Sequence, residues 1–223
     1  MRRNALLLLI LAVLTGLTCI TSCWPWHPDS DANPSVVTPG YTPPVVTQGY
    51  RLFKGDTEGL LVSFEYPDSW VFEDGESNSI YADFHLRFGY QNSITLQFSS
   101  EVSVRSFPQS FSLPPSHFKN ASDFLEYKVS DVSGLSSFQS ISKGKYKLGN
   151  VEGEEASYSF LDIMVVSVEI GTELRQNVIY RHVVADYEGR IYWVRLRVNT
   201  DVDKFEDYNP DFEHLLATFK FLE

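Results

Sequence analysis

Cysteine is absent from the whole chain beyond its N-terminal segment. The 223 residues include only two cysteines, Cys19 and Cys23. A folded region that lacks cysteine can form no disulfide, no thiolate metal site and no cysteine nucleophile. Any role of the two cysteines therefore concerns the segment that precedes the folded region.

Basic residues are also scarce. Lysine and arginine number 18 against 29 acidic residues, which gives a net charge of −11. Arg2 and Arg3 are the only charged residues among the first 22, so the rest of the chain carries −13. Binding to nucleic acid requires basic patches that neutralise phosphate, and this composition argues against it. The ordinary use of such a charge is solubility.

The common catalytic signatures are missing as well. The sequence contains no G-x-S-x-G, no H-E-x-x-H, no glycine loop for phosphate and no dinucleotide fingerprint. Four histidines, His85, His117, His182 and His214, are scattered along the region after residue 50. Serines are numerous, so a count alone does not exclude a Ser/His/Asp set. We predict no catalytic residues, no metal site and no cofactor.

The first 22 residues have the pattern of a secretory signal peptide. Arg2 and Arg3 are followed by an unbroken apolar run, Ala5 to Leu14. This run is shorter than the ~20 residues that a membrane-spanning helix needs. A short positive region followed by a short apolar region is typical of export signals.

The next residues, Ile20-Thr21-Ser22-Cys23, resemble the bacterial lipobox. The resemblance implies diacylglyceryl transfer to the sulfur of Cys23, cleavage before it, and acylation, for example by palmitate, of the new amino group. Cys19 fits less well, because Gly16 and Thr18 would occupy the −3 and −1 positions. Two alternatives stay open: an ordinary cleaved signal peptide and an uncleaved signal anchor.

A proline-rich segment separates this cysteine from the folded region. Residues 24–49 hold six of the eleven prolines and show no apolar periodicity. Such a composition favours extended polyproline conformations and cannot bury a core. We therefore predict a signal peptide at 1–22, a lipidated cysteine and tether at 23–49, and one globular domain at 50–223.

The domain reads as strands with two helices, which predicts an α+β fold with a mainly antiparallel central sheet flanked by helices. Alternating side chains indicate strands at 60–66, 79–88, 93–100 and 156–163. Prolines indicate a loop at 106–120. A helix is expected to begin near 120–122. Asn209, followed by Pro210, is the expected N-cap of a last helix whose apolar stripe is Phe212, Leu215, Leu216 and Phe219.

The clearest local pattern is a hairpin. Val178–Tyr187 and Arg190–Asn199 flank Glu188-Gly189, a plausible two-residue turn. This register places Val183 and Ala185 on one face together with Tyr192, Val194 and Leu196. The opposite face is predicted to carry the candidate contact residues Tyr180, His182, Trp193, Arg195 and Arg197.

Three features resemble the PsbP-like family. They are Phe64-Glu65-Tyr66-Pro67-Asp68-Ser69-Trp70, the helix at 122–130, and the C-terminal pattern from Gly189 to Phe219. The resemblance implies an α/β/α sandwich and a binding or assembly role rather than one defined chemistry. It implies no functional site here, since ligand residues of the photosystem member have no counterparts in this sequence.

Arginine and aromatic side chains are favoured at interfaces, so the polar hairpin face is the best candidate contact surface. The alternative is that a helix covers this face and that Trp193 belongs to the core. Two acidic stretches, 152–155 in an expected turn and 201–211, raise the question of an ion site. A solvated acidic edge explains both, and whether 201–211 binds an ion is left open. Lys143, Lys145 and Lys147 are expected on the exposed side of a strand.

These features together favour a lipid-anchored, extracytoplasmic binding or assembly protein without catalysis. Its expected partners are the membrane, through lipid on Cys23, and a protein or membrane complex. The alternative is an anchored protein of the cell envelope that binds a small ligand or metal ion.

Overall fold

A computed structural model describes residues 45–55, 60–75, 84–91, 98–109, 112–113, 116–167 and 172–222, with Val45–Glu223 forming one compact unit. The predicted signal peptide, Cys23 and most of the predicted tether lie outside the described residues. No helix among the described residues is long and apolar enough to cross a membrane.

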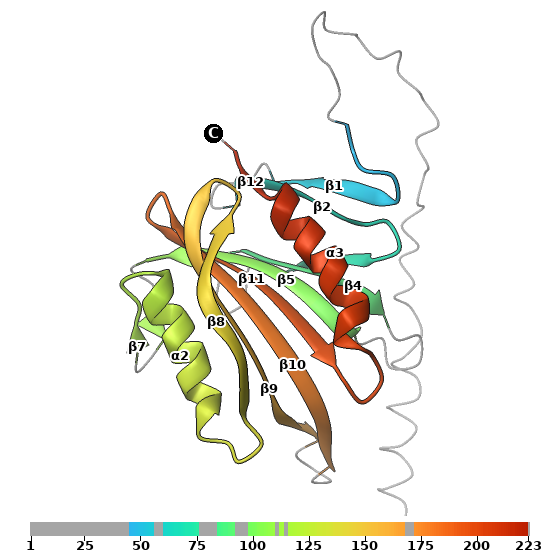
Figure 1. Ribbon diagram of the computed structural model, residues 1–223, viewed down its shortest axis with the longest axis vertical. Coiled ribbons are helices and arrows are strands. Elements are labelled where there is room, and N and C mark those ends of the chain that lie inside the picture. Colours follow the sequence, from blue (N-terminus) through green and yellow to red (C-terminus); the bar gives the residue numbers. More distant parts are fainter. Residues whose placement is uncertain are drawn as a thin grey trace, which may run out of the picture. The chain divides into compact units, whose positions relative to one another are not determined.

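The fold is built on an antiparallel sheet of seven strands, in the order β3-β4-β5-β11-β10-β9-β8 (Figure 1). Its strands are β3 Val71–Gly75, β4 Phe84–Gln91, β5 Phe98–Pro108, β8 Gln139–Leu148, β9 Val151–Ser167, β10 Thr172–Tyr187 and β11 Arg190–Asn199. A second sheet pairs β1 Tyr50–Lys54, β2 Val62–Pro67 and β12 Lys220–Phe221, and β6 Ser112–Leu113 pairs with β7 Ser116–His117. The predicted antiparallel α+β architecture is confirmed.

The hairpin register predicted from alternation is also confirmed. Val178 pairs with Asn199 and Tyr187 with Arg190, so β10 and β11 pair over ten residues. Glu188 and Gly189 have φ angles of 49° and 73°. Positive φ at both central positions is the type I′ geometry, whose twist matches that of the flanking strands.

One helix packs on each face of the seven-stranded sheet. Helix α2, Ala121–Ser133, begins where predicted, because the Asn120 side chain accepts a hydrogen bond from the Asp123 amide. Its Phe124 and Leu125 pack against Val184 and Trp193. Val129 and Val132, which follow Leu125 at helical spacing, are only partly buried. Consecutive strand residues point to opposite faces, so Val183 lies on the other side of the sheet.

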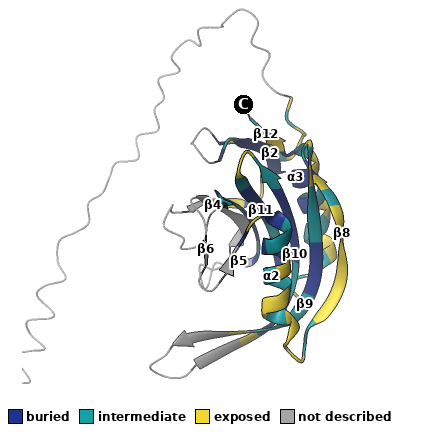
Figure 2. Ribbon diagram, turned by 90° about the vertical axis from the view of Figure 1, so that its left-hand side faces the viewer, coloured by how far each residue is buried: buried dark blue, intermediate teal, exposed yellow. Residues whose placement is uncertain are grey.

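Helix α3, Phe205–Thr218, covers that other side. The predicted stripe is confirmed, since Phe212, Leu215, Leu216 and Phe219 are all at most 1% exposed. They pack with Val183 and its neighbours and with the β1-β2-β12 sheet. Figure 2 shows the resulting line of buried residues along the central strands.

The predicted start of α3 was wrong. The helix begins at Phe205, with Lys204 at the N-cap, and Pro210 lies inside it. Glu206 and Asp207 supply the acids of the first turn. Asn209 is engaged elsewhere, because its side chain accepts a hydrogen bond from Arg181 Nη1 at 2.9 Å. A tertiary contact and the apolar packing of Phe205 therefore extend the helix through the proline.

Other strand predictions differ in detail. The strand at 60–66 was expected to be half-buried, but all of β2 is buried because α3 covers its polar side, where His214 Nε2 lies 2.8 Å from the Glu65 carboxylate. The loop expected at 106–120 is shorter, since β5 continues to Pro108. Residues 92–97, in the expected strand 93–100, lie outside the described residues.

Candidate functional site

The five hairpin residues predicted as a contact surface do lie on one face of the sheet. Strand pairing sets Tyr180 beside Arg197, His182 beside Arg195, and Val184 beside Trp193. Helix α2 packs on the same face through its contacts with Val184 and Trp193. We call the set Tyr180, His182, Trp193, Arg195 and Arg197, together with the side chains that touch it, the hairpin face.

An aromatic stack runs across the hairpin face. Phe160 and Tyr180 have ring centroids 5.5 Å apart, Tyr180 and His182 5.5 Å, and His182 and Trp193 5.6 Å. The corresponding interplanar angles are 11°, 17° and 15°. Near-parallel rings supported by strands on both sides form a rigid layer, so its partly exposed members, Phe160 and Tyr180, lose little conformational freedom on binding.

Hydrogen bonds fix the tautomer of His182. The indole Nε1–H of Trp193 donates to His182 Nδ1 at 2.8 Å, and an indole can only donate. Nδ1 therefore carries no proton. The proton of the neutral ring is on Nε2, 2.8 Å from the Tyr158 hydroxyl oxygen. Both ring nitrogens are thus used within the protein.

His182 is also held neutral. Burial, followed by the charges of Arg195, Lys128 and Arg105, holds the pKa of His182 well below 6.5. Burial likewise raises the pKa of the Tyr158 hydroxyl. The His182 ring is therefore uncharged near neutral pH, and both of its nitrogens are engaged within the protein.

The prediction that all five residues form a surface needs correction. His182 is 2% exposed, Trp193 3% and Arg197 8%, because α2 and the stack cover them. The alternative, in which a helix covers this face and Trp193 is core, describes these residues correctly. Tyr180 and Arg195 remain partly exposed. The accessible part of the hairpin face is therefore smaller than the five-residue surface that the sequence predicts.

Three cations surround the Trp193 ring. The guanidinium carbon of Arg105 lies 4.8 Å from the ring centroid, Lys128 Nζ 5.2 Å and the guanidinium carbon of Arg195 5.4 Å. Such contacts are favourable with the electron-rich face of an indole. Burial, and then Arg195, lowers the pKa of Lys128 to about 8; Arg105 acts in the same direction and Asp131 opposes it.

Two carboxylates accompany these cations along the strands. Arg195 Nη2 forms an ion pair with Glu101, and both side chains are largely buried. Arg197 Nη2 lies 3.6 Å from Asp162 Oδ2, and its Nε donates to the Tyr180 hydroxyl at 3.2 Å. The accessible part of the hairpin face therefore carries charged and aromatic side chains that are held by partners within the protein. Interfaces are enriched in arginine and aromatic residues of this kind.

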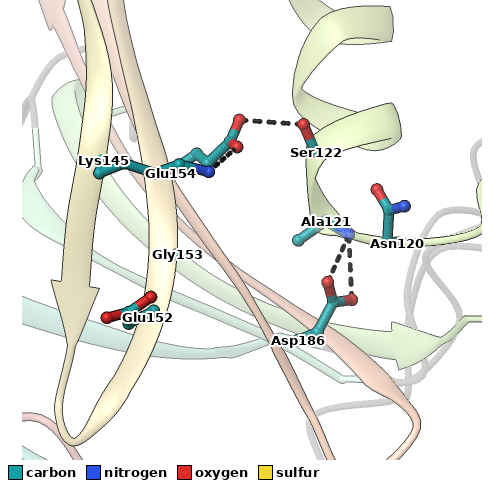
Figure 3. Close-up of a pocket in the computed structure, with 8 residues that line it drawn as sticks. All are labelled: Asn120, Ala121, Ser122, Lys145, Glu152, Gly153, Glu154 and Asp186. Carbon is teal, nitrogen blue, oxygen red and sulfur yellow. Dashed lines mark hydrogen bonds and ion pairs between the residues drawn. The ribbon is translucent and has the colours of Figure 1, made fainter.

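A separate pocket of about 350 Å³ lies at the start of α2 (Figure 3). The Asp186 carboxylate accepts from the Ala121 amide at 2.9 and 3.0 Å, and so occupies the helix N-terminus. Glu154 accepts from Ser122 Oγ and is paired with Lys145 Nζ at 2.5 Å. These polar groups form hydrogen bonds and an ion pair with one another. We therefore interpret the pocket as part of the contact between α2 and the sheet.

Several carboxylates of the two acidic stretches also have partners within the fold. Residues 152–155 lie in β9 and not in a turn, and Glu155 pairs with Arg181. Near α3, Asp201 accepts from Asn177 and Asp203 from Ser100 Oγ. Among the described residues, no three His, Cys, Asp or Glu side chains are placed to hold a metal ion.

The remaining predicted residues are dispersed. Lys143 and Lys145 lie on the exposed strand β8 and pair with Glu126 and Glu154, and Lys147 is exposed on the same strand. His214 lies on α3, away from His182. The side chains of His85 and His117 lie outside the described residues.

Sequence reasoning missed Arg105, Lys128, Glu101 and Ser103 as members of the hairpin face. Glu101, Ser103 and Arg105 lie on β5, which pairs with β11, and Lys128 lies on α2. Some 65 to 95 residues of chain separate them from Trp193 and Arg195. The one available signal was alternation in β5, which places Glu101, Ser103 and Arg105 on one side of a strand.

No protein-family model and no curated protein sequence matches this chain. Similar solved structures include cyanobacterial PsbP from Synechocystis sp. PCC 6803, with 14% identity over 82% of this chain and 98% of that chain and a TM-score of 0.47. LpqN of Mycobacterium tuberculosis, described as involved in cell envelope biogenesis, has 12% identity over 78% and 91% and a TM-score of 0.46. The Ran-binding protein Mog1p of Saccharomyces cerevisiae has 10% identity over 78% and 96% and a TM-score of 0.43.

These neighbours belong to the PsbP-like fold family, the resemblance that the sequence motifs indicate. At 8% to 14% identity the likeness concerns the fold alone.

Proposed function

We propose that this chain is a lipoprotein, anchored through Cys23 outside the cytoplasm, whose domain binds a protein or membrane complex without catalysing a reaction. The observation that carries the binding role is the hairpin face: a rigid aromatic stack whose member Tyr180 is partly exposed, with the partly exposed Arg195 beside it. Aromatic and arginine side chains on a rigid support are the usual anchors of protein interfaces.

The hydrogen bonding of His182 supports binding over catalysis. A general base needs a nitrogen free to take a proton from a substrate. Here Nδ1 is occupied by the Trp193 indole, Nε2 by Tyr158, and the ring is 2% exposed. The imidazole therefore serves to hold the stack in place.

The second candidate is an anchored protein that binds a small ligand or ion. It is favoured by a different observation, the three cations around Trp193. Binding of a small ligand and binding of a protein partner predict different outcomes in the experiments below.

The anchor is tested by replacing Cys23 with serine. We expect the unchanged chain to incorporate labelled palmitate and to sediment with membranes, because two or more acyl chains bind a bilayer stably. Cys23→Ser should lose the label and leave the membrane fraction. Cys19→Ser is the matched control and should behave like the unchanged chain. Label retained in Cys23→Ser would contradict the lipoprotein assignment.

A further inference from the structure

Strand β9 continues beyond the strand that pairs with one of its edges. β8 lies along β9 as far as Gln139, which is opposite Ser159. β9 continues to Ser167 and keeps its pairing with β10 on the other edge. Among the described residues, no strand pairs with the β8 side of β9 beyond Ser159. We call Leu161–Val165, which follows this point and precedes an irregularity in the pairing with β10, the β9 extension.

The backbone of the β9 extension presents hydrogen-bonding groups at this edge. The Leu161 amide points outward, since it donates to the Ser137 side chain at 3.0 Å. In an antiparallel sheet every second residue directs its N–H and C=O to the same neighbour. The corresponding groups of Ile163 and Val165 therefore point outward as well. A row of such groups is a template for a further strand.

The side chains of the β9 extension do not protect this edge. Natural edge strands commonly carry lysine or proline, which oppose pairing with another strand. The β9 extension has neither, and its one charged residue, Asp162, lies 3.6 Å from Arg197 of the same chain. Ile163 at its centre is 50% exposed. The edge strand β8, by contrast, carries three lysines, Lys143, Lys145 and Lys147.

We propose that the β9 extension pairs, antiparallel and across a two-fold axis at Ile163, with the β9 extension of a second copy of this chain. This register sets Leu161 opposite Val165 and Asp162 opposite Met164. Apolar residues therefore meet, and no two like charges face each other. A two-fold axis also closes the contact, so that each extension is used once and assembly stops at a dimer.

The other self-pairing, through the edge strand β8, is disfavoured by charge. An axis at Gly144 would set Lys143 opposite Lys145, and like charges directly opposite each other destabilise a strand pair. The short β9 extension makes a small interface, so we expect a weak dimer that forms where copies are concentrated, as they would be on one membrane. The pairing goes beyond the proposed function and rests on the proposed anchor for this concentration alone.

The test exchanges charges at the axis in two differently tagged copies of the full chain, in their native membranes. With Ile163→Lys in both copies, recovery of one tag with the other should fall about tenfold, because the two ammonium groups face each other. Ile163→Glu in both copies should have the same effect. Ile163→Lys in one copy and Ile163→Glu in the other should restore recovery, because opposite charges then meet.

Ile141→Lys in both copies is the matched control, since Ile141 is 57% exposed on the edge strand β8. It should leave recovery unchanged. Both positions are at least half exposed, so these variants are expected to fold like the unchanged chain. A photo-crosslinking amino acid in place of Ile163 should give a covalent dimer of this chain, identified by mass spectrometry, and no larger product.

The pairing is overturned if unchanged copies do not recover each other, or if the mixed pair of variants recovers no better than either matched pair. It is also overturned if the crosslinked product contains another protein in place of the second copy. Palmitate labelling of Cys23, measured in the same cells, judges the anchor by itself, so the two proposals can fail separately.

Discussion

Arg181→Met lowers the free energy of unfolding by about 2 to 3 kcal/mol, the largest loss we expect from a single exchange of a charged residue. Arg181 lies on β10 facing α3 and is 8% exposed. Its Nη2 is 2.8 Å from Glu155, and its Nη1 2.5 Å from Glu213 and 2.9 Å from Asn209. One side chain therefore ties the sheet to α3.

The expected size follows from what the exchange leaves behind. Removing one partner of a fully buried ion pair costs about 3 to 5 kcal/mol, because the other charge stays buried alone. Here the Glu155 and Glu213 side chains are 22% and 45% exposed, so water compensates part of the loss. The Arg181 guanidinium carbon also lies 5.6 Å from the centroid of the Tyr146 ring and 5.5 Å from that of Phe212. Methionine keeps an apolar side chain beside these rings, so the loss comes from the contacts of the guanidinium group.

Lys143→Met is the matched control. It removes one positive charge from an ion pair with Glu126 whose side chains are 50% and 65% exposed. Exposed pairs of this kind contribute about 0.5 kcal/mol or less. Urea unfolding followed by circular dichroism measures both variants. Equal stability of Arg181→Met and Lys143→Met would show that the Arg181 network does not hold α3 to the sheet.

The second large effect is a loss of stability in acid that depends on His182. Its pKa in the folded chain is held well below 6.5, first by burial and then by Arg195, Lys128 and Arg105. Above about pH 6.5 the ring is neutral in both states and contributes no pH dependence. Below that value the unfolded chain binds a proton that the folded chain does not.

Stability should therefore fall as the pH decreases, by about 1.4 kcal/mol per pH unit from this group. The fall continues with decreasing pH until the pH reaches the folded-state pKa of His182, which burial holds well below 6.5. His182→Gln keeps a donor and an acceptor but does not titrate, so its stability should fall less steeply between pH 6.5 and 5. The measurement is the difference between the two curves of unfolding free energy against pH, in which carboxyl groups common to both, such as Glu65, cancel.

Tyr158→Phe is the control for the hydrogen bond alone. It removes the hydroxyl 2.8 Å from His182 Nε2 but leaves the imidazole buried. Its curve should be displaced to lower stability and keep the steep fall below pH 6.5. Parallel curves for the unchanged chain and His182→Gln would contradict a buried neutral histidine.

Much of the fold could be predicted from local patterns in the sequence. Glu188-Gly189 between two alternating runs fixed the hairpin register, since only one pairing puts Val183 and Val194 together in the core. Asn120 likewise marked the start of α2 through its capping hydrogen bond. Both features depend on residues close together in the chain.

What could not be predicted depends on contacts between distant segments. Asn209 and Pro210 have the right chemistry for a helix start, but Arg181 from β10 binds the Asn209 side chain and α3 begins at Phe205. Glu154 and Glu155 were predicted to be solvated, but the fold places Lys145 beside Glu154 and Arg181 beside Glu155. Such pairings follow from the order of the strands, which alternation within one strand does not reveal.

The candidate site, too, could be predicted from the sequence only in part. Alternation placed Tyr180 and Arg195 on one face of the hairpin, and this is confirmed. Alternation cannot tell which part of a face a helix covers, so the burial of His182 and Trp193 was left as an alternative. Lys128 lies beside Trp193 because α2 packs on the sheet, and alternation within the strands does not predict this contact.

The proposed role of the hairpin face is to bind a protein or membrane complex outside the cytoplasm. Its most direct test places a photo-crosslinking amino acid at Tyr180 in the full chain, in its native membranes, and identifies the products by mass spectrometry. The same substitution at Lys147, on exposed strand β8, is the control. We predict one reproducible crosslinked product from position 180 that is absent from position 147. The same products from both positions, or none from position 180, would contradict it.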